Sequence, residues 1–151
     1  MKTMLLIAVL FGATGLFGAT GWTDDFAAAK AKAGKEGKCV LLAFSGSDWC
    51  HWCVKLDSEV YSKPEFLGLA TNNYVLVLAD LPQNKSKISP ATYARNRELA
   101  GKFKVRGFPC GIVCGADGTE LGRIGGYVKG GPKAYFGEME KIRAKAPAAA
   151  K

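Results

Sequence analysis

The sequence predicts an α/β domain in which a mixed central sheet carries helices on both faces. Two continuous apolar runs of strand length, Cys39–Ser45 and Tyr74–Asp80, are typical of strands that are buried on both sides. Segments with helical spacing separate these runs, and strands that are joined through helices pair in parallel. Later in the chain, Asp117-Gly118 stands between two apolar runs and predicts a hairpin, which adds an antiparallel strand.

The first predicted helix opens the domain. Apolar residues between Trp22 and Ala33 recur at helical spacing. Thr23 or Asp24 can cap this helix, and the glycine-containing stretch 34–38 ends it. The remaining predicted helices run from a cap at Ser47 or Asp48 through Leu56 toward Val60, from Pro64 to about Asn73, from Ala91 to Phe103, and from Pro132 to Ala146.

Two further strands are expected after the polar loop 81–90 and the helix that follows it. Gly107-Phe108-Pro109 breaks the chain before the short strand Cys110–Cys114, and Leu121–Val128 is the returning strand of the hairpin. The predicted order of elements is therefore α-β-α-β-α-β-β-α.

The N-terminus has the pattern of a secretory signal. A short basic start with Lys2 precedes an apolar stretch, and Ala19-Thr20-Gly21 fits the small-residue cleavage rule. We expect residues 1–21 to be a cleaved signal peptide, 22–146 a single domain, and 147–151 a flexible tail. The alternative is an uncleaved anchor, which the glycines and threonines of the stretch weaken. Export to a bacterial periplasm is predicted, with secretion or membrane anchoring as alternatives, and no stable membrane insertion after cleavage.

The charge balance favours no nucleic-acid partner. The chain has 21 Lys and Arg against 13 Asp and Glu, a formal net charge of +8. These basic residues are scattered and do not alternate with aromatic side chains in a dense run. Export would place the five cysteines in an oxidising compartment, where disulfides persist. Because five is odd, at least one thiol stays outside a lasting bridge.

The segment SGSDWCHWCVKL, from Ser45 to Leu56, contains Cys50 and Cys53 as a C-x-x-C pair between a buried strand and a helix. The first cysteine then lies at a helix N-terminus, where free N–H groups and the helix dipole favour an anion. Such thiols can have a pKa far below the usual value of about 8.5. The second cysteine lies one turn further along and can attack back. His51, in its protonated form, would also stabilise a Cys50 thiolate near neutral pH.

Four segments together resemble the thioredoxin superfamily. They are DWCHWCVKLDSEVYSKPEF, the strand that ends in Asp80, VRGFP, and the GADGTELGRIGGY hairpin. The resemblance covers Trp22 to Ala146 and is greatest to exported thioredoxin-like proteins with a Trp-Cys-x-x-Cys motif. The reductase domain of bacterial transmembrane thiol carriers is also similar. The resemblance implies a thioredoxin fold.

The same resemblance implies thiol–disulfide exchange. Cys50 would attack a substrate disulfide, and Cys53 would then displace the reduced substrate from the mixed disulfide. Pro109 would be a cis proline that faces the pair. With Phe108 it would hold an incoming peptide, and Trp49 and Trp52 complete the expected substrate-binding set. The implied partners are protein or peptide thiols and disulfides and an upstream redox partner, with no cofactor.

Two positions depart from the family pattern. Ala43 or Phe44 stands where ordinary thioredoxins carry a buried Asp that helps to move the proton of the second cysteine. Proton transfer would then use water or one of two candidates on the helix, Lys55 and Glu59. Cys110 follows the expected cis proline where a Thr is usual.

Alternatives to redox exchange stay open on the sequence. Cys50 and Cys53 could hold a metal with Cys110 or His51, form an inert bridge, or belong to a non-catalytic peptide-binding module. Cys39 and Cys114 should lie at one end of the sheet, either as buried thiols or as a cross-strand disulfide. Asp80 is predicted to cap a loop. The net direction of exchange, the substrate and the electron donor are not set by these patterns.

Overall fold

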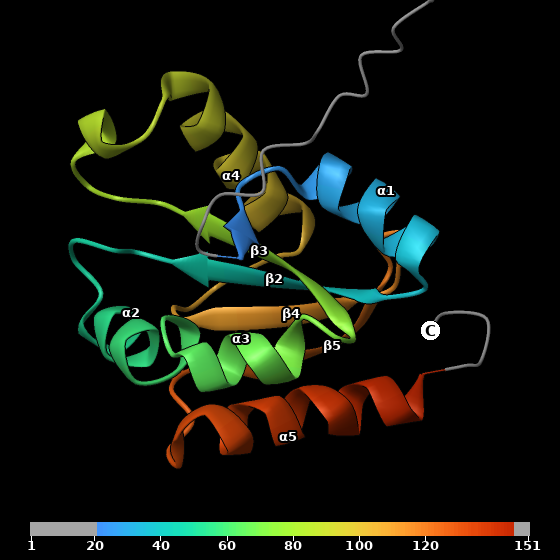
Figure 1. Ribbon diagram of the computed structural model, residues 1–151. Coiled ribbons are helices and arrows are strands. Elements are labelled where there is room, and N and C mark those ends of the chain that lie inside the picture. The colour runs from blue at the N-terminus through green and yellow to red at the C-terminus, as the bar shows by residue number, and fades with distance from the viewer. Residues whose placement is uncertain (1–20, 147–151) are drawn as a thin grey trace, which may run out of the picture.

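The computed structural model describes residues 21–146 and contains a mixed sheet with strand order β1-β3-β2-β4-β5 (Figure 1). Strands β2 and β3 are parallel, β4 runs antiparallel to β2, and β5 runs antiparallel to β4. The predicted mixed α/β sheet is confirmed. The strands are β1 (Trp22–Thr23), β2 (Cys39–Ser45), β3 (Tyr74–Asp80), β4 (Cys110–Cys114) and β5 (Glu120–Gly125).

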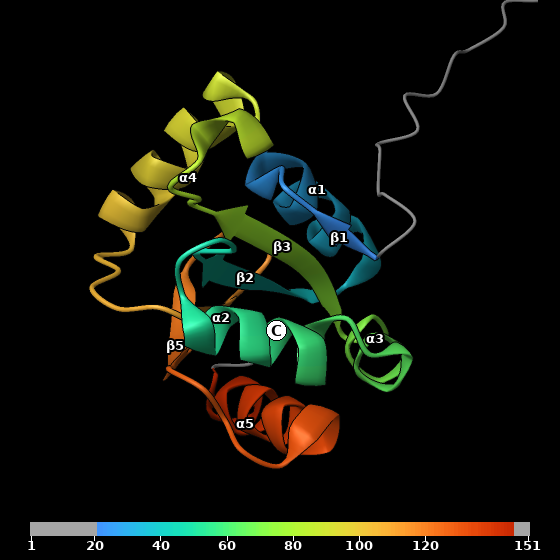
Figure 2. The same cartoon turned by 90° about the vertical axis from the view of Figure 1, so that its left-hand side faces the viewer.

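Helices cover both faces of this sheet (Figures 1 and 2). One face carries α1 (Phe26–Glu36) and α4 (Pro90–Lys102), and we call the side chains packed there the α1–α4 layer. The other carries α2 (His51–Leu56), α3 (Pro64–Ala70) and α5 (Gly131–Lys145), over what we call the α2–α5 layer. Successive strand residues alternate between the two layers, so the central strands are buried on both faces, as their continuous apolar runs predict.

The start of the domain differs from the prediction. Trp22–Thr23 is not helical but forms the edge strand β1, which pairs in parallel with β3. Helix α1 begins only at Phe26, because Asp25 is its N-cap and accepts the N–H of Ala28 at 2.9 Å. The expected caps at Thr23 and Asp24 were therefore wrong. Two residues of β1 are too few to show a period-two pattern, and the helical spacing extended over them.

The helix after the cysteine pair is also less regular than predicted. α2 is α-helical only through Leu56, and a π-helical segment, η1 (Asp57–Tyr61), continues it. The extra residue per turn brings two consecutive side chains, Val60 and Tyr61, onto the buried face. The expected loop 81–90 contains a short 3₁₀ helix, η2 (Lys85–Lys87).

The hairpin strand β5 ends earlier than expected, at Gly125 rather than Val128. Gly126 has a φ of +77°, which favours glycine, and its N–H donates to the carbonyl oxygen of Pro109 at 2.8 Å. This bond turns the chain away from the sheet and ties the β5–α5 loop to the segment before β4.

The predicted signal peptide, apart from Gly21, and the predicted tail 147–151 lie outside the described residues. Among residues 21–146, no helix is both long and apolar enough to cross a membrane.

Candidate active site

The two cysteines of the C-x-x-C motif form a disulfide at the N-terminus of α2, with their Cα atoms 5.2 Å apart. Cys50 is the N-cap of this helix, and its Sγ accepts the N–H of Cys53 at 3.2 Å. The N–H that a thiolate at Cys50 would need as a donor is therefore already directed at the sulfur. Cys53 lies one turn further along, on the buried side of α2.

The predicted caps Ser47 and Asp48 hold the preceding loop and do not cap α2. Ser47 donates its N–H and its hydroxyl to the two carboxylate oxygens of Asp80, at 2.9 and 2.6 Å. Asp48 accepts the N–H groups of Gln83 and Asn84, at 2.8 and 2.9 Å, and bonds of this kind lower the pKa of its carboxyl group. The loop that carries Cys50 is thus bound to the segment after β3, and Asp80 acts as the loop cap that the sequence predicts.

Trp49 joins this loop to the cis-proline segment. Its indole Nε1 donates to the carbonyl oxygen of Leu81 at 2.8 Å, and its ring meets Phe108 edge-on, with centroids 5.4 Å apart. Gly46 is needed for this arrangement, because a Cβ there would overlap the Trp49 ring. The indole remains 43% exposed, so it can still contact another molecule.

A second aromatic pair lies on the other side of the motif. Trp52 is 51% exposed, and its ring lies 5.4 Å from that of Tyr127 and 5.4 Å from that of His51. Tyr127 directly follows Gly126, which is bonded to Pro109. Our reading of the sequence missed Tyr127 as a site residue. Its only signal was its place at the end of the GGY stretch that closes the hairpin.

The peptide bond between Phe108 and Pro109 is cis, as the resemblance implied. Cys110, the next residue, is the β4 partner of Phe44, one position before β2 ends and the loop to the motif begins. The structure therefore brings the expected substrate-binding residues, Trp49, Trp52, Phe108 and Pro109, to one end of the sheet together with the disulfide. Their contact with a substrate remains a prediction.

The two candidates for proton transfer bind each other. Lys55 Nζ lies 2.7 Å from Glu59 Oε1, and Glu59 Oε2 accepts the hydroxyl of Tyr127. The bond from Lys55, and then that from Tyr127, lower the pKa of Glu59, while the bond to Glu59 raises the pKa of Lys55. These shifts keep both groups charged near neutral pH. The ion pair borders the Tyr127 ring, which packs on Trp52, and a role in proton transfer stays a prediction.

The structure shows which of Ala43 and Phe44 faces the C-x-x-C helix. Ala43 points into the α2–α5 layer, together with Leu56 of α2, whereas Phe44 points into the α1–α4 layer. Ala43 is therefore the residue that faces the helix of the motif. Among the described residues, none of the buried side chains is acidic.

The other three cysteines are buried thiols, and the predicted alternative of a Cys39–Cys114 bridge is excluded by the strand register. Cys114 pairs with Val40, so Cys39 lies one residue out of register and points into the opposite layer. Burial raises the pKa of Cys110, and it raises that of Cys114 to about 12. Buried thiols of this kind are poor nucleophiles near neutral pH.

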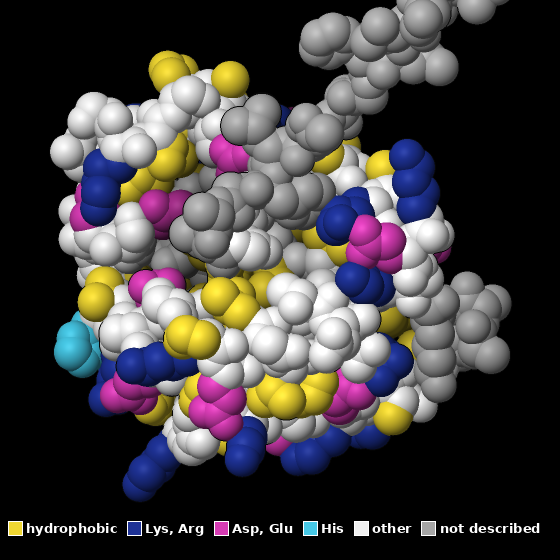
Figure 3. Space-filling view, in the orientation of Figure 1, with side chains coloured by type: hydrophobic (Ala, Val, Ile, Leu, Met, Phe, Trp, Pro, Cys, Tyr) yellow, Lys and Arg dark blue, Asp and Glu magenta, His cyan; other side chains and the backbone are white. Residues whose placement is uncertain are grey.

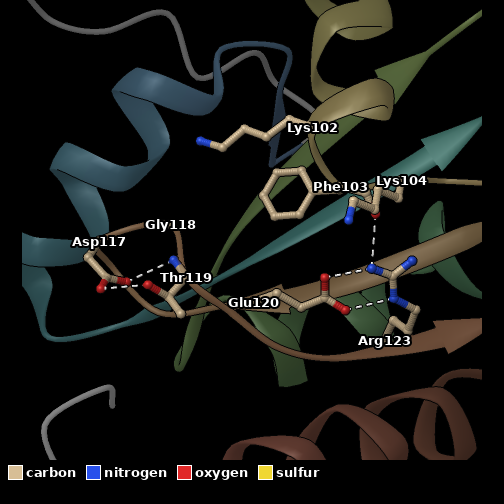
Figure 4. Close-up of a pocket in the computed structure, with 8 residues that line it drawn as sticks. All are labelled: Lys102, Phe103, Lys104, Asp117, Gly118, Thr119, Glu120 and Arg123. Carbon is tan, nitrogen blue, oxygen red and sulfur yellow. Dashed lines mark hydrogen bonds and ion pairs between the residues drawn. The ribbon is translucent and has the colours of Figure 1, made fainter.

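A cavity of about 510 Å³ lies on the α4 side of the sheet, where the β4–β5 turn approaches the end of α4 (Figure 4). Its Arg123 is bound by Glu120 and by the carbonyl oxygen of Phe103, as the dashed lines in Figure 4 show. A second cavity of about 390 Å³ extends to Pro109 and Cys110. Neither cavity is lined by Cys50 or Cys53.

The metal-carrier alternative finds no site in this arrangement. Within residues 21–146, no three His, Cys, Asp or Glu side chains are placed to hold an ion together. Cys110 points into the α1–α4 layer, away from the α2 side where Cys53 is buried.

On the face drawn in Figure 3, Lys and Arg side chains alternate with Asp and Glu and do not gather into one basic patch.

Comparison with known proteins agrees with the fold and the motif. A family model described as a thioredoxin-like domain matches residues 26–140. The disulfide bond reductase DsbH of Chlamydia pneumoniae is 32% identical over 117 residues, which cover 78% of this chain and 69% of that protein. The thiol:disulfide interchange protein DsbD of a Pseudomonas species is 32% identical over 102 residues, but these cover only 16% of its length.

Solved structures extend this agreement to three dimensions. A structure of a DsbH oxidoreductase superposes with a TM-score of 0.75 at 30% identity, covering 83% of this chain and 85% of that one. A thioredoxin from Thermus thermophilus superposes with a TM-score of 0.63 at 20% identity, covering 86% and 92%, and supports the fold alone. The chain belongs to the thioredoxin-like family and is a thioredoxin-fold disulfide oxidoreductase.

Proposed function

We propose that this protein reduces protein disulfides outside the cytoplasm, with Cys50 as the nucleophile and Cys53 as the resolving cysteine. The observation that carries the proposal is the position of Cys50 as the N-cap of α2, where its sulfur already accepts the Cys53 N–H. That bond and the helix dipole stabilise the thiolate that must attack. His51 adjoins the sulfur in sequence and adds positive charge when it is protonated.

The reaction begins with the reduced pair. The Cys50 thiolate attacks one sulfur of the substrate disulfide, and the other substrate sulfur leaves as a thiolate. Cys53, as a thiolate, then attacks Cys50 Sγ and releases the second substrate sulfur. The product is the Cys50–Cys53 disulfide seen in the structure. Two electrons from an upstream dithiol partner are needed to reduce it again.

The exposed aromatic side chains at the motif support recognition of a peptide. Trp49 and Trp52 stand on two sides of it, and each packs against a residue tied to the cis-proline segment. We infer that a substrate chain lies extended along Phe108 and Pro109, where its disulfide can reach Cys50. This placement also explains why both indoles remain partly exposed after packing.

The reducing direction rests on the relatives. DsbH is named a disulfide bond reductase, and the chain spans 69% of it. An exported location, with the periplasm of a bacterium as the compartment, agrees with the signal-like residues 1–21. In such an oxidising compartment a reductase needs a dedicated supply of electrons, which is why an upstream redox partner belongs to the proposal.

Turnover of a protein disulfide tests the proposal. With insulin as the substrate and dithiothreitol as the reductant, the purified protein should accelerate reduction, and Cys50→Ser should return the rate to the uncatalysed background. Cys114→Ala, which removes a thiol of the opposite layer, serves as the matched control and should retain the rate. If Cys50→Ser kept full activity, the assignment of the nucleophile would be wrong.

The reduction potential of the Cys50–Cys53 couple tests the direction separately. A value near about −270 mV is expected of a reductase. A value between about −120 and −180 mV would contradict the reducing direction and indicate an oxidant or isomerase.

A further inference from the structure

The cavity of about 390 Å³ beside Pro109, which we call the cis-proline cavity, has a basic lining. Its charged lining residues are Lys104, Arg106 and Arg123, and within residues 21–146 none of those that line it is acidic. Phe108 and Pro109 belong to the same lining. A substrate chain that lies extended along these two residues, as we propose, therefore passes the cavity.

Only part of this positive charge is neutralised by the protein itself. Glu120 accepts hydrogen bonds of 2.7 and 2.6 Å from the guanidinium group of Arg123, as Figure 4 shows. Among the described residues, Lys104 and Arg106 form no ion pair with a carboxylate. Two of the three cations of the cavity can therefore bind an anionic group of another molecule.

Lys104 has a backbone conformation that favours glycine. It follows Phe103, the C-cap residue of α4, and has a φ of +50°. Its N–H donates to the carbonyl oxygen of Gly101 at 3.1 Å. The next N–H, of Val105, donates to the carbonyl oxygen of Ala100 at 2.9 Å. These two bonds form a Schellman motif, in which glycine usually takes the position of Lys104 because a Cβ is unfavourable there.

A lysine at this position costs stability that a glycine would not cost. In the part of the chain that the structure describes, Lys104 is the one residue other than glycine with a positive φ. Its side chain borders both the cis-proline cavity and the larger cavity drawn in Figure 4. A strained residue at a candidate binding site indicates that the position requires its side chain and tolerates its backbone.

Glycines leave the cavity accessible from outside. Gly107, Gly125 and Gly126 line it, and a Cβ at any of them would meet no atom within 4 Å beyond its neighbours in the chain. Arg123 and Gly125 are two residues apart on β5, so they lie on the same face of that strand. β5 is an edge strand, and no other strand of the described residues covers its outer side. We therefore expect a polypeptide to reach the cations from this edge.

We propose that the cis-proline cavity binds an acidic side chain of the substrate, a few residues from the disulfide that Cys50 attacks. Lys104 and Arg106 recognise its carboxylate, since a guanidinium group can bind both carboxylate oxygens and an ammonium group adds a point charge. The cavity thus selects substrates by charge, because a basic side chain placed there would be repelled. This inference rests on the proposed function, which places the substrate chain along Phe108 and Pro109.

Reduction of matched disulfide peptides tests the inference. Three cyclic peptides share one intramolecular disulfide and carry two Glu, two Gln or two Lys on each side of it. Their rates with dithiothreitol alone correct for differences in their own reactivity. The wild-type protein should reduce the Glu peptide with a kcat/KM at least about fivefold above that of the Lys peptide, because each partly exposed ion pair contributes up to a few-fold. At about 0.5 M salt this preference should fall below about twofold.

Two double variants with the same change in net charge separate the cavity from the overall charge. Lys104→Gln with Arg106→Gln should reduce the preference for the Glu peptide to less than about twofold. Lys35→Gln with Lys145→Gln is the matched control and should retain the preference. It removes two charges from the last turns of α1 and α5, which end on the side of the molecule opposite α2 (Figure 1). Equal losses in both double variants, or equal rates of the wild-type protein on the Glu and Lys peptides, would overturn the inference.

Single variants at Lys104 separate loss of the charge from loss of the fold. Lys104→Gly should raise the urea concentration at which half of the protein is unfolded, because glycine accepts the positive φ. The same variant should lower the preference for the Glu peptide, whereas Lys104→Arg keeps the charge and should retain it. A Lys104→Gly protein that kept the full preference would overturn the role of Lys104.

A binding measurement separates this inference from the proposed function. Peptides in which Ser replaces both Cys cannot be reduced, and their binding can be followed through the amide NMR signals of Lys104, Arg106 and Gly125. The Glu peptide should shift these signals, and the Lys peptide should leave them unchanged. Such shifts without turnover of any disulfide peptide would contradict the proposed function alone. Turnover of the disulfide peptides without these shifts would overturn the role of the cavity.

Discussion

The cysteines of this chain occupy two kinds of position, and the contrast shows what makes a thiol reactive. Cys50 and Cys53 lie at the first turn of α2, where the Cys53 N–H donates to Cys50 Sγ. Cys110 and Cys114 lie inside β4, where the backbone groups bond to neighbouring strands. Burial there raises the pKa of both thiols. We therefore expect the same side chain to act as a nucleophile at a helix end and as an apolar packing group in a sheet.

The largest expected effect is on alkylation rates in the reduced protein. At pH 7, iodoacetamide should modify Cys50 at least about a hundredfold faster than Cys114, because the pKa of Cys114 is raised to about 12 and little of it is thiolate. Since burial disfavours the charged form, the thiolate fraction of Cys114 rises about tenfold per pH unit up to pH 10. Timed quenching and peptide mass mapping measure both rates. Equal rates at pH 7 would remove the contrast.

The next effect is on the free energy of unfolding, at two glycines that differ in the space around them. Gly111→Ala should lower the free energy of unfolding by about 1–3 kcal/mol, because the added methyl group overlaps the Tyr135 hydroxyl. Gly68→Ala, at an exposed position of α3 with open space around it, should instead raise stability by about 0.5–1 kcal/mol. Urea denaturation measures both changes. Equal effects at the two glycines would show that the close approach at Gly111 carries no energetic weight.

A smaller effect is expected at the rim of the reactive pair. Trp52→Ala should raise KM for insulin about fivefold with little change in kcat, because it removes exposed apolar contact area without touching a sulfur. Tyr93→Ala, which removes an α4 aromatic packed with Lys85, is the control and should leave KM unchanged. A loss confined to kcat would show that Trp52 acts on the chemistry and not on binding.

The smallest effect is expected from Tyr127→Phe. This change removes only the hydroxyl bonded to Glu59 and keeps the ring that packs on Trp52. Turnover of insulin should change by less than about twofold, since a partly exposed polar contact contributes little. A tenfold loss would mean that the Lys55–Glu59 pair takes part in proton transfer after all.

Local sequence patterns predict much of this structure. The strand β2, the helix after it and the cis bond before β4 all appear where the sequence placed them, and so does the order of the principal elements. The errors fall where a long-range contact decides. The spacing of apolar residues predicts a helix at Trp22, yet this residue belongs to strand β1 and pairs with β3. Ser47 is predicted to cap a helix, yet it binds Asp80 at the end of another strand.

The site divides in the same way. Cys50, Cys53, Phe108 and Pro109 were found from motifs, whereas Tyr127 was not. The buried Tyr61–Tyr135 pair of the core was not found from the sequence either. Tyr61 and Tyr135 are 74 residues apart, and no local pattern shows that their hydroxyls meet. Which of Ala43 and Phe44 faces the motif also needed the register of the sheet, because one residue decides the face.

By itself, the sequence determined that a C-x-x-C pair starts a helix after a buried strand, because apolar periodicity and helix-end electrostatics act over a few residues. Only the tertiary structure decided which thiols point into which layer and which tyrosine hydroxyls meet in the α2–α5 layer. Those outcomes depend on strand register and on packing between segments far apart in the chain, and they are set when β2, β4 and α5 come together.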